Sequence, residues 1–233
     1  MDDIIKIKGL SKDFDGKRAL DNINLNIKRG EVLGLIGPNS SGKSSLIRSI
    51  MGLISPSQGE VLIDNKKNDK AIRANISYMP DKFSFYEDLK VADLLNLYGD
   101  MYEDFNMKKC LKLIEFLSLP KDSRIKSLSK GYKKRLMGAL ALSRIAPIYL
   151  LDEPLEGLDP IAREAFIDLL INRLDKGASF VIASHNIGDL EYLFDRVVFL
   201  DLGKILKDSD VRELREKEKM DLADYYKEVY GLL

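Results

Sequence analysis

Residues 37–44 read Gly37-Pro38-Asn39-Ser40-Ser41-Gly42-Lys43-Ser44. Two glycines separated by four residues and followed by lysine and serine are typical of a phosphate-binding loop. The surroundings agree with this interpretation, because the apolar run 32–36 predicts a strand buried on both faces and residues 44–53 predict a helix. We therefore expect an α/β fold with a mainly parallel sheet and a phosphate site at this turn.

The loop has the chemistry that a nucleoside triphosphate requires. Backbone N–H groups at the start of a helix surround a phosphate group, and Gly42 lets the backbone approach it closely. The Lys43 ammonium group can pair with the β- and γ-phosphates, and the Ser44 hydroxyl can ligate Mg²⁺. ATP and Mg²⁺ are the predicted cofactors. The predicted nucleotide-binding residues of this segment are Gly37, Pro38, Asn39, Ser40, Ser41, Gly42, Lys43, Ser44 and Ser45.

Two further polar positions follow buried strands. Asp152 and Glu153 come directly after the apolar run 148–151, and strands of this kind end at the sheet edge where α/β proteins bind ligands. Asp152 can hold Mg²⁺ through a water molecule, and Glu153 can orient and deprotonate the attacking water. His185, the single histidine, follows the apolar run 180–183 and can contact the γ-phosphate, although a lone histidine is more often structural.

Hydrophobic spacing outlines the remaining elements. Strands are expected at 4–7, 19–27, 59–65, 179–183 and 196–200, and helices at 91–101, 107–117, 131–145 and 161–174. These patterns predict a core with a β subdomain (1–81 and 146–205), a helical insertion (82–145) and a charged helical tail (206–233).

Composition narrows the functional classes. Thirty-seven basic and 37 acidic residues balance in the 233-residue chain, so no nucleic-acid partner is expected. The acidic N-terminus has no signal-peptide pattern, and no apolar run approaches the ~20 residues that span a bilayer. We expect a cytoplasmic protein whose work on a membrane would need a second chain.

Residues 128–132 read Leu128-Ser129-Lys130-Gly131-Tyr132 and look like the Leu-Ser-Gly-Gly-Gln signature of ABC transporters. Together with the loop and the acidic pair, the chain resembles the nucleotide-binding subunit of these transporters over about residues 3–205. The resemblance implies an ABC ATPase fold, with a P-loop NTPase core, an antiparallel β subdomain and an inserted α-helical subdomain.

The resemblance also implies roles for individual residues. Ser129 and Gly131 would bind the γ-phosphate held by an opposite subunit, and Asp159 would lie in the D-loop that crosses the dimer interface. His185 matches the switch histidine. Phe14 matches the aromatic residue that stacks on adenine, with a core aromatic as the alternative.

Two departures from the family pattern are informative. Lys130 and Tyr132 replace the signature's second glycine and its glutamine, a variant that looks like the bacterial ABC-2-type export branch. Asp81 stands where the Q-loop glutamine belongs, so it can contact Mg²⁺ directly or through a bridging water.

The favoured hypothesis is an ATPase that powers a membrane exporter, peripheral on the inner membrane face, with a second ATP-binding subunit (a homodimer or a paralogue) and permease chains as partners. Aromatic residues between Asp81 and Tyr102, including Phe83, Phe85 and Tyr86, are expected to dock the permease or to fill the seam between core and insertion. The alternatives are a soluble ABC ATPase acting on translation or DNA, and a regulatory module that does not hydrolyse ATP.

Overall fold

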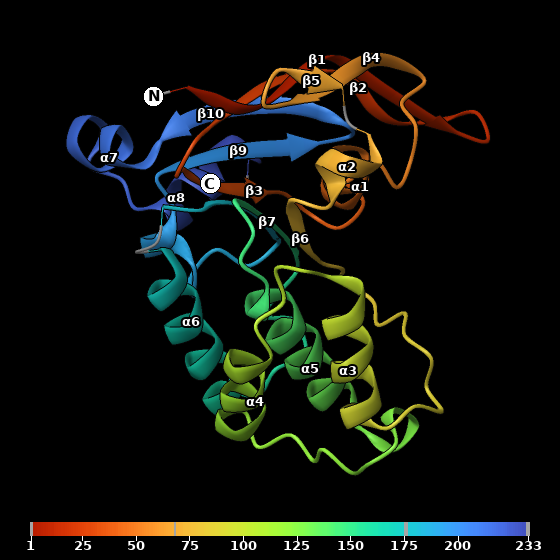
Figure 1. Cartoon of the computed structure of the whole chain (residues 1–233). Coiled ribbons are helices and arrows are strands. Elements are labelled where there is room, and N and C mark those ends of the chain that lie inside the picture. Colours follow the sequence, from red (N-terminus) through yellow and green to blue (C-terminus); the bar gives the residue numbers. More distant parts are fainter. Residues whose placement is uncertain (1, 68, 175–176, 232–233) are drawn as a thin grey trace.

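The computed structural model describes residues 2–67, 69–174 and 177–231 and builds them around two β-sheets (Figure 1). In this described part, the larger sheet has the strand order β10-β9-β3-β8-β7-β6. All its neighbouring strands are parallel except β10, which pairs antiparallel with β9. The strands are β3 (Val32–Ile36), β6 (Ile76–Met79), β7 (Ile148–Asp152), β8 (Ser179–Ser184), β9 (Arg196–Asp201) and β10 (Lys204–Asp210). The predicted mainly parallel sheet is confirmed.

The smaller sheet is antiparallel, with the order β2-β1-β4-β5. Its strands are β1 (Asp3–Phe14), β2 (Lys17–Lys28), β4 (Gln58–Ile63) and β5 (Lys66–Lys67). In β2 the buried Ile23, Leu25 and Ile27 alternate with exposed asparagines, as expected for a strand with one buried face. This sheet lies above the larger one in Figure 1.

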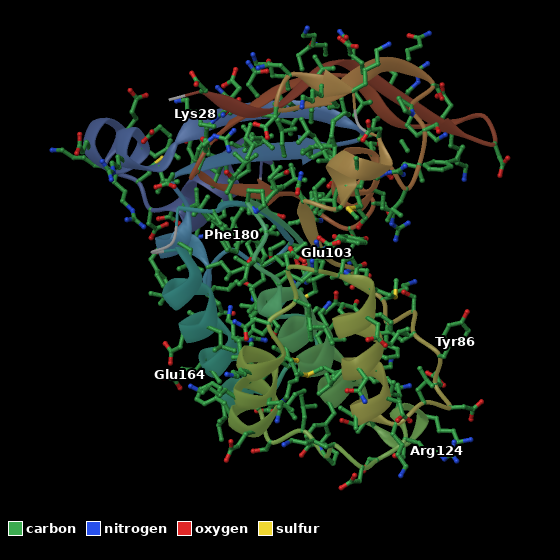
Figure 2. All side chains as sticks on the ribbon, viewed as in Figure 1. Lys28, Tyr86, Glu103, Arg124, Glu164 and Phe180 are labelled. Atoms are coloured by element: carbon green, nitrogen blue, oxygen red, sulfur yellow. The ribbon has the colours of Figure 1, made fainter. Side chains whose placement is uncertain are left out.

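Strand β3 separates two hydrophobic cores. Leu33 and Leu35 face the core shared with the small sheet and helix α1 (Lys43–Ile50), whereas Val32 and Ile36 face the core shared with the other large helices. Phe180 of β8 lies in this second core, between sheet and helices (Figure 2). Burial on both faces explains the continuous apolar run of β3.

A helical insertion connects β6 to β7, as predicted. It contains α3 (Val91–Met101), α4 (Met107–Phe116) and α5 (Lys130–Ser143), with a 3₁₀ turn at Ile125–Ser127. Helix α5 packs against α6 (Pro160–Leu174) at Gly138, where a Cβ atom would stand 2.0 Å from Cε2 of Phe166. The absence of a side chain at Gly138 therefore sets how closely the insertion meets the core.

Several predicted boundaries were wrong. The first strand, predicted at 4–7, runs from Asp3 to Phe14, and the helix predicted at 131–145 is α5, which ends at Ser143. Helix α1 ends at Ile50 instead of residue 53, because Gly52 takes a left-handed conformation (φ +70°) and turns the chain. Residues 206–210 belong to strand β10 and not to a helical tail. The Asp210 side chain then accepts hydrogen bonds from the N–H groups of Arg212 and Glu213, and so caps the helix that follows.

The C-terminal tail folds back onto the large sheet. It comprises α7 (Val211–Glu213), a π-helical turn (Leu214–Glu218) and α8 (Leu222–Val229), while shorter helical pieces elsewhere are α2 (Lys70–Arg73) and a 3₁₀ turn at Glu191–Leu193. Tyr225, Tyr226 and Tyr230 surround Phe199 of β9. The Tyr230 hydroxyl donates to the Leu200 carbonyl (2.7 Å) and lies 3.3 Å from the Ile36 carbonyl, directly before the phosphate loop. No helix of the described residues is long and apolar enough to cross a membrane.

Candidate active site

The loop at 37–44 lies between β3 and α1, in the predicted strand–turn–helix context. Gly42 precedes α1 with φ +114°, and a Cβ atom there would stand 2.9 Å from the Ala19 carbonyl oxygen. At Gly37 a Cβ atom would stand 2.4 Å from the Leu200 carbonyl oxygen. Both positions of the motif therefore require glycine. Gly37 requires it for close packing, and Gly42 requires it for close packing and for its left-handed backbone conformation.

Lys43 ties the loop together in this structure. Its side chain is buried, and Nζ donates to the carbonyl oxygens of Gly37 (2.7 Å) and Pro38 (3.0 Å). The same Nζ lies 3.4 Å from Oε1 of Glu153. Beside it is a cavity of about 550 Å³, lined by Ala19, Asn39, Ser40, Ser41, Gly42, Lys43, Ser44, Ser45, Asp81, Lys82, Glu153 and Glu156. Most of the predicted phosphate-loop residues thus face one cavity.

Asp152, the last residue of β7, is fully buried and contacts Ser44, one of the residues that line this cavity. The Ser44 hydroxyl donates to its Oδ1 at 3.1 Å, while among the described residues its Oδ2 has no hydrogen-bond partner. Burial raises the pKa of Asp152, and the charges of Asp81 and Glu153 raise it further. An unpaired buried carboxylate oxygen beside a hydroxyl and a second carboxylate fits the oxygen ligands that Mg²⁺ prefers.

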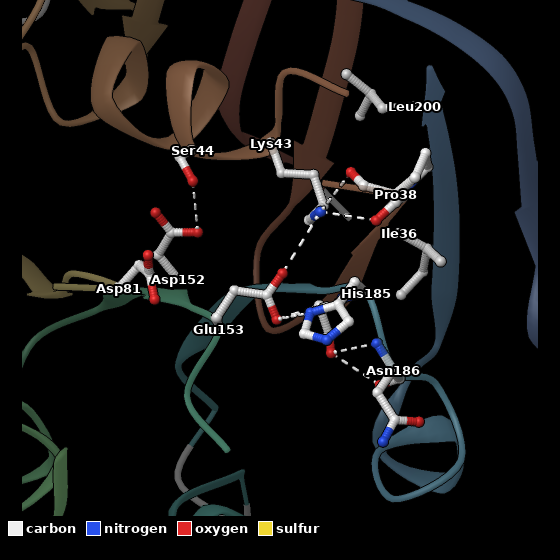
Figure 3. A network of polar contacts seen from close by, with 12 residues as sticks. Ile36, Pro38, Lys43, Ser44, Asp81, Asp152, Glu153, His185, Asn186 and Leu200 are labelled. Atoms are coloured by element: carbon white, nitrogen blue, oxygen red, sulfur yellow. Dashed lines mark hydrogen bonds and ion pairs between the residues drawn. The ribbon is translucent and has the colours of Figure 1, made fainter. Parts of the chain in front are cut away.

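Glu153 stands at the centre of the polar network drawn in Figure 3. Its backbone adopts a left-handed conformation (φ +49°), its N–H donates to the Ala183 carbonyl at 2.9 Å, and only 8% of the residue is exposed. Its Oε2 lies 2.9 Å from Nδ1 of His185, within hydrogen-bonding distance. Glu153 therefore contacts Lys43 with one carboxylate oxygen and His185 with the other.

Asp81 follows β6 at the same sheet edge and lines the cavity. Its backbone carbonyl accepts a hydrogen bond (3.1 Å) from Nζ of Lys134, which also lies 3.8 Å from its Oδ1. Sequence reasoning missed Lys134. The sequence held a signal for it. Met137 and Gly138 follow Lys134 at the helical spacing of three and four residues, which places this lysine on the apolar face of α5.

The signature and D-loop residues lie together, apart from the phosphate-loop cavity. Ser129 caps α5, its hydroxyl accepting from the N–H of Tyr132, and a Cβ atom at Gly131 would stand 3.4 Å from the Gly157 carbonyl oxygen. Asp159 pairs with Arg135 of α5. None of the predicted residues Ser129, Gly131 and Asp159 is among the described residues that line the loop's cavity.

Phe14 ends strand β1 at the hairpin with β2, and 44% of the residue is exposed. Nζ of Lys12 lies 4.9 Å from the centre of its ring. Phe14 is not among the described residues that line the phosphate-loop cavity. The exposure excludes a core aromatic, which was the alternative to adenine stacking.

Comparison with known proteins identifies the family. The family described as ABC transporter matches residues 20–156, more than half of the chain. The chain belongs to the ABC transporter family. YtrB of Bacillus subtilis, an ABC transporter ATP-binding protein, is 31% identical over 92% of this chain and 74% of its own length. The lantibiotic transport ATP-binding protein SrtF of Streptococcus pyogenes is 29% identical over 89% of this chain and 91% of its own length.

Solved structures agree with this assignment. An ATP-binding subunit of an ABC transporter superimposes with a TM-score of 0.88 at 26% identity, covering 97% of this chain and 99% of that one. The dimeric ABC transporter cassette MJ0796 superimposes with a TM-score of 0.80 at 28% identity, covering 88% and 98%. Another structure of that cassette, a post-hydrolysis state with ADP and Pi, has a TM-score of 0.79 and covers 88% and 98%. The present ABC protein is thus a nucleotide-binding ATPase subunit of a transporter.

Proposed function

We propose that this ABC subunit hydrolyses Mg-ATP with Glu153 as general base, as one half of a nucleotide-sandwich dimer that drives an exporter. The observation that carries the catalytic part is the position of the buried Glu153 carboxylate, between Lys43 of the phosphate loop and His185. A carboxylate at this edge can accept the proton of a water molecule that attacks the γ-phosphate.

Mg²⁺ would be held by Ser44, Asp152 and Asp81, directly or through water, and would neutralise charge on the phosphate oxygens. Lys43 would exchange its contacts with the Gly37 and Pro38 carbonyls for contacts with the β- and γ-phosphates. The loop N–H groups and the start of α1 would bind the same phosphates. His185 would contact the γ-phosphate while Glu153 orients its ring.

The Glu153→Gln variant tests the catalytic role. The amide cannot accept the proton, so turnover is expected to fall by ~10²–10⁴-fold while ATP still binds. ATPase activity and ATP affinity would be measured on the purified protein. Glu164→Gln is the matched control, because Glu164 is an exposed carboxylate that points away from the core on α6 (Figure 2). Hydrolysis at the wild-type rate by Glu153→Gln would refute the assignment.

The separation of the two proposed phosphate-binding elements supports the dimer. Ser129 and Gly131 are not among the described residues that line the phosphate-loop cavity, which agrees with a signature that acts on the γ-phosphate held by a second chain. The partner would be a second copy or a paralogue. Lys43→Ala and Ser129→Arg proteins are expected to be inactive alone and to regain activity when mixed, because a mixed dimer keeps one intact composite site of two. Mixed dimers that form without activity would contradict the model.

A permease is the proposed membrane partner. A cavity of about 450 Å³ opens between the core and the insertion, with Arg48, Leu53, Tyr78, Phe85 and Tyr98 in its lining. Phe85 contacts Phe83 and Tyr98 edge to face, so these rings fill the seam. Tyr86 is 80% exposed and points outward in Figure 2. Of the predicted docking residues, Tyr86 is therefore the one most available to a partner.

Single substitutions separate docking from packing. Tyr86→Ser is expected to leave folding and ATP binding unchanged and to weaken co-purification with the permease, since exposed aromatic side chains are favoured contact residues. Phe85→Ser is expected to lower stability as well. The control is Tyr192→Ser, at another exposed tyrosine (52%), which lies in the 3₁₀ turn at Glu191–Leu193 and outside the helical insertion. Undiminished binding of Tyr86→Ser would exclude this residue from the interface.

Export is proposed because Lys130 and Tyr132 give the signature variant that resembles ABC-2-type exporters. The relative SrtF, which is named for lantibiotic transport, supports the same direction. Docking on a permease would place the subunit on the cytoplasmic face of the membrane. A role in translation or DNA repair is not favoured, because the similar curated proteins are named as transporter subunits.

A further inference from the structure

Lys134 is a buried cation that the chemistry described so far does not use. Only 5% of the residue is exposed, and it projects from the first half of α5, five positions after Ser129. Its neighbour Lys133 pairs instead with Glu87, whose side chain is 55% exposed. Burying a lysine is unfavourable unless a partner of opposite charge or an acceptor compensates it.

Asp81 provides that compensation. Nζ of Lys134 donates to its backbone carbonyl at 3.1 Å and lies 3.8 Å from its Oδ1. Burial lowers the pKa of Lys134, while the charges of Asp81, Glu156, Asp152 and Glu153 oppose that shift. The lysine thus faces the acidic groups around the proposed metal site, and its direct contacts are with Asp81.

Without this contact, repulsion from Asp152 would favour movement of Asp81 away from the metal edge. Its negative charge acts on Asp152, whose carboxylate is fully buried. Like charges at a buried site repel strongly, because the interior screens them less than water does. A cation that holds Asp81 from the opposite side keeps it at the cavity despite that repulsion.

We propose that Lys134 is a positioning residue that holds Asp81 at the metal edge and links its place to that of the signature helix α5. A displacement of α5 would move Lys134, and with it the carboxylate of Asp81. The N-terminal end of α5, which is proposed to contact phosphate, is thereby connected to the proposed metal site of the same chain through the Lys134 side chain. This inference rests on the proposed role of Asp81 in Mg²⁺ binding.

A double-mutant cycle in the Glu153→Gln background tests the inference without hydrolysis. The proteins carry Lys134→Gln, Asp81→Ala, both changes or neither, and the MgCl₂ concentration that gives half-maximal binding of a fluorescent ATP analogue is measured for each. With Asp81 present, Lys134→Gln is expected to raise this midpoint by about tenfold, within the range of coupling between contacting residues. With Ala at position 81, removal of the lysine charge is expected to leave the midpoint unchanged or lower it.

Controls separate positioning from general effects. Lys134→Arg should keep the MgCl₂ midpoint near that of the Glu153→Gln parent. Lys133→Gln makes the same charge change one residue away and should not shift the midpoint. A rise of equal size in both backgrounds would show a merely structural role and overturn the inference. A fall in both backgrounds would show simple charge neutralisation and overturn it too. If Asp81→Ala alone leaves the midpoint unchanged, the metal role of Asp81 fails, and the inference with it.

Discussion

Replacement of Gly138 by alanine should destabilise the protein, although alanine is the better helix former. Two opposing effects decide the sign. Alanine favours the interior of a helix over glycine by about 1 kcal/mol. Against this, the new Cβ would stand 2.0 Å from Cε2 and 2.9 Å from Cζ of Phe166, a ring that is fully buried. Overpacking of this kind costs ~1–3 kcal/mol, and a contact this short lies at the upper end.

The expected net loss in the free energy of unfolding is therefore about 1–2 kcal/mol. For a chain of this length that corresponds to a fall in Tm of about 2–8 °C. Urea unfolding of the nucleotide-free protein and thermal unfolding would both measure it. The control is Phe166→Leu, which removes the ring atoms that the new Cβ at position 138 would contact.

Phe166→Leu alone should destabilise, because it leaves space in a packed core. In the Gly138→Ala protein the same change should cost less, or should restore stability, because the two residues compete for one volume. A Gly138→Ala protein at least as stable as the wild type would show that α5 and α6 separate without cost, and would refute the reasoning. Additive effects of the two substitutions would refute it as well.

Three further outcomes are expected. Asp152→Asn should abolish Mg²⁺-dependent hydrolysis but stabilise the nucleotide-free protein by on the order of 1 kcal/mol at neutral pH. Because the pKa of Asp152 is raised in the folded state, the wild-type protein loses stability as the pH rises through the folded-state pKa of this carboxyl group. Urea unfolding should therefore show that the stability advantage of the asparagine variant shrinks in acid. Phe14→Ser should weaken ATP binding by about tenfold through lost stacking, with Tm unchanged, and an unaltered affinity in a binding titration would remove Phe14 from the adenine site. Tyr230→Phe should lower stability by about 1 kcal/mol and raise the KM for ATP, and equal KM values for the two proteins would show that the tail does not influence the loop.

The sequence predicted the core of the fold well where burial was continuous or alternating. Strand β3 and helix α3 have the predicted bounds, because an uninterrupted apolar run and a clear helical period each leave one interpretation. The phosphate loop was predictable for a related reason, since its glycines, lysine and serine stand in fixed order between a strand and a helix.

Other elements were not predictable from local patterns. Strand β10 is mostly exposed and polar, and it forms by pairing with β9, a contact between segments that only the fold brings together. The Lys134–Asp81 contact joins residues that are 53 positions apart in the chain. The composite site could be proposed only through family resemblance, because the signature's place relative to the phosphate loop depends on tertiary structure.

The hydrogen bond from Tyr230 has a consequence for synthesis of the protein on the ribosome. Tyr230 lies 194 residues after Ile36, whose carbonyl precedes the phosphate loop. At ~5–20 residues per second, the ribosome needs roughly 10–40 s to advance from one to the other. During that interval the strand that carries the loop exists without the hydroxyl that later contacts its last carbonyl. The loop therefore acquires this contact only after the chain has been synthesised as far as Tyr230.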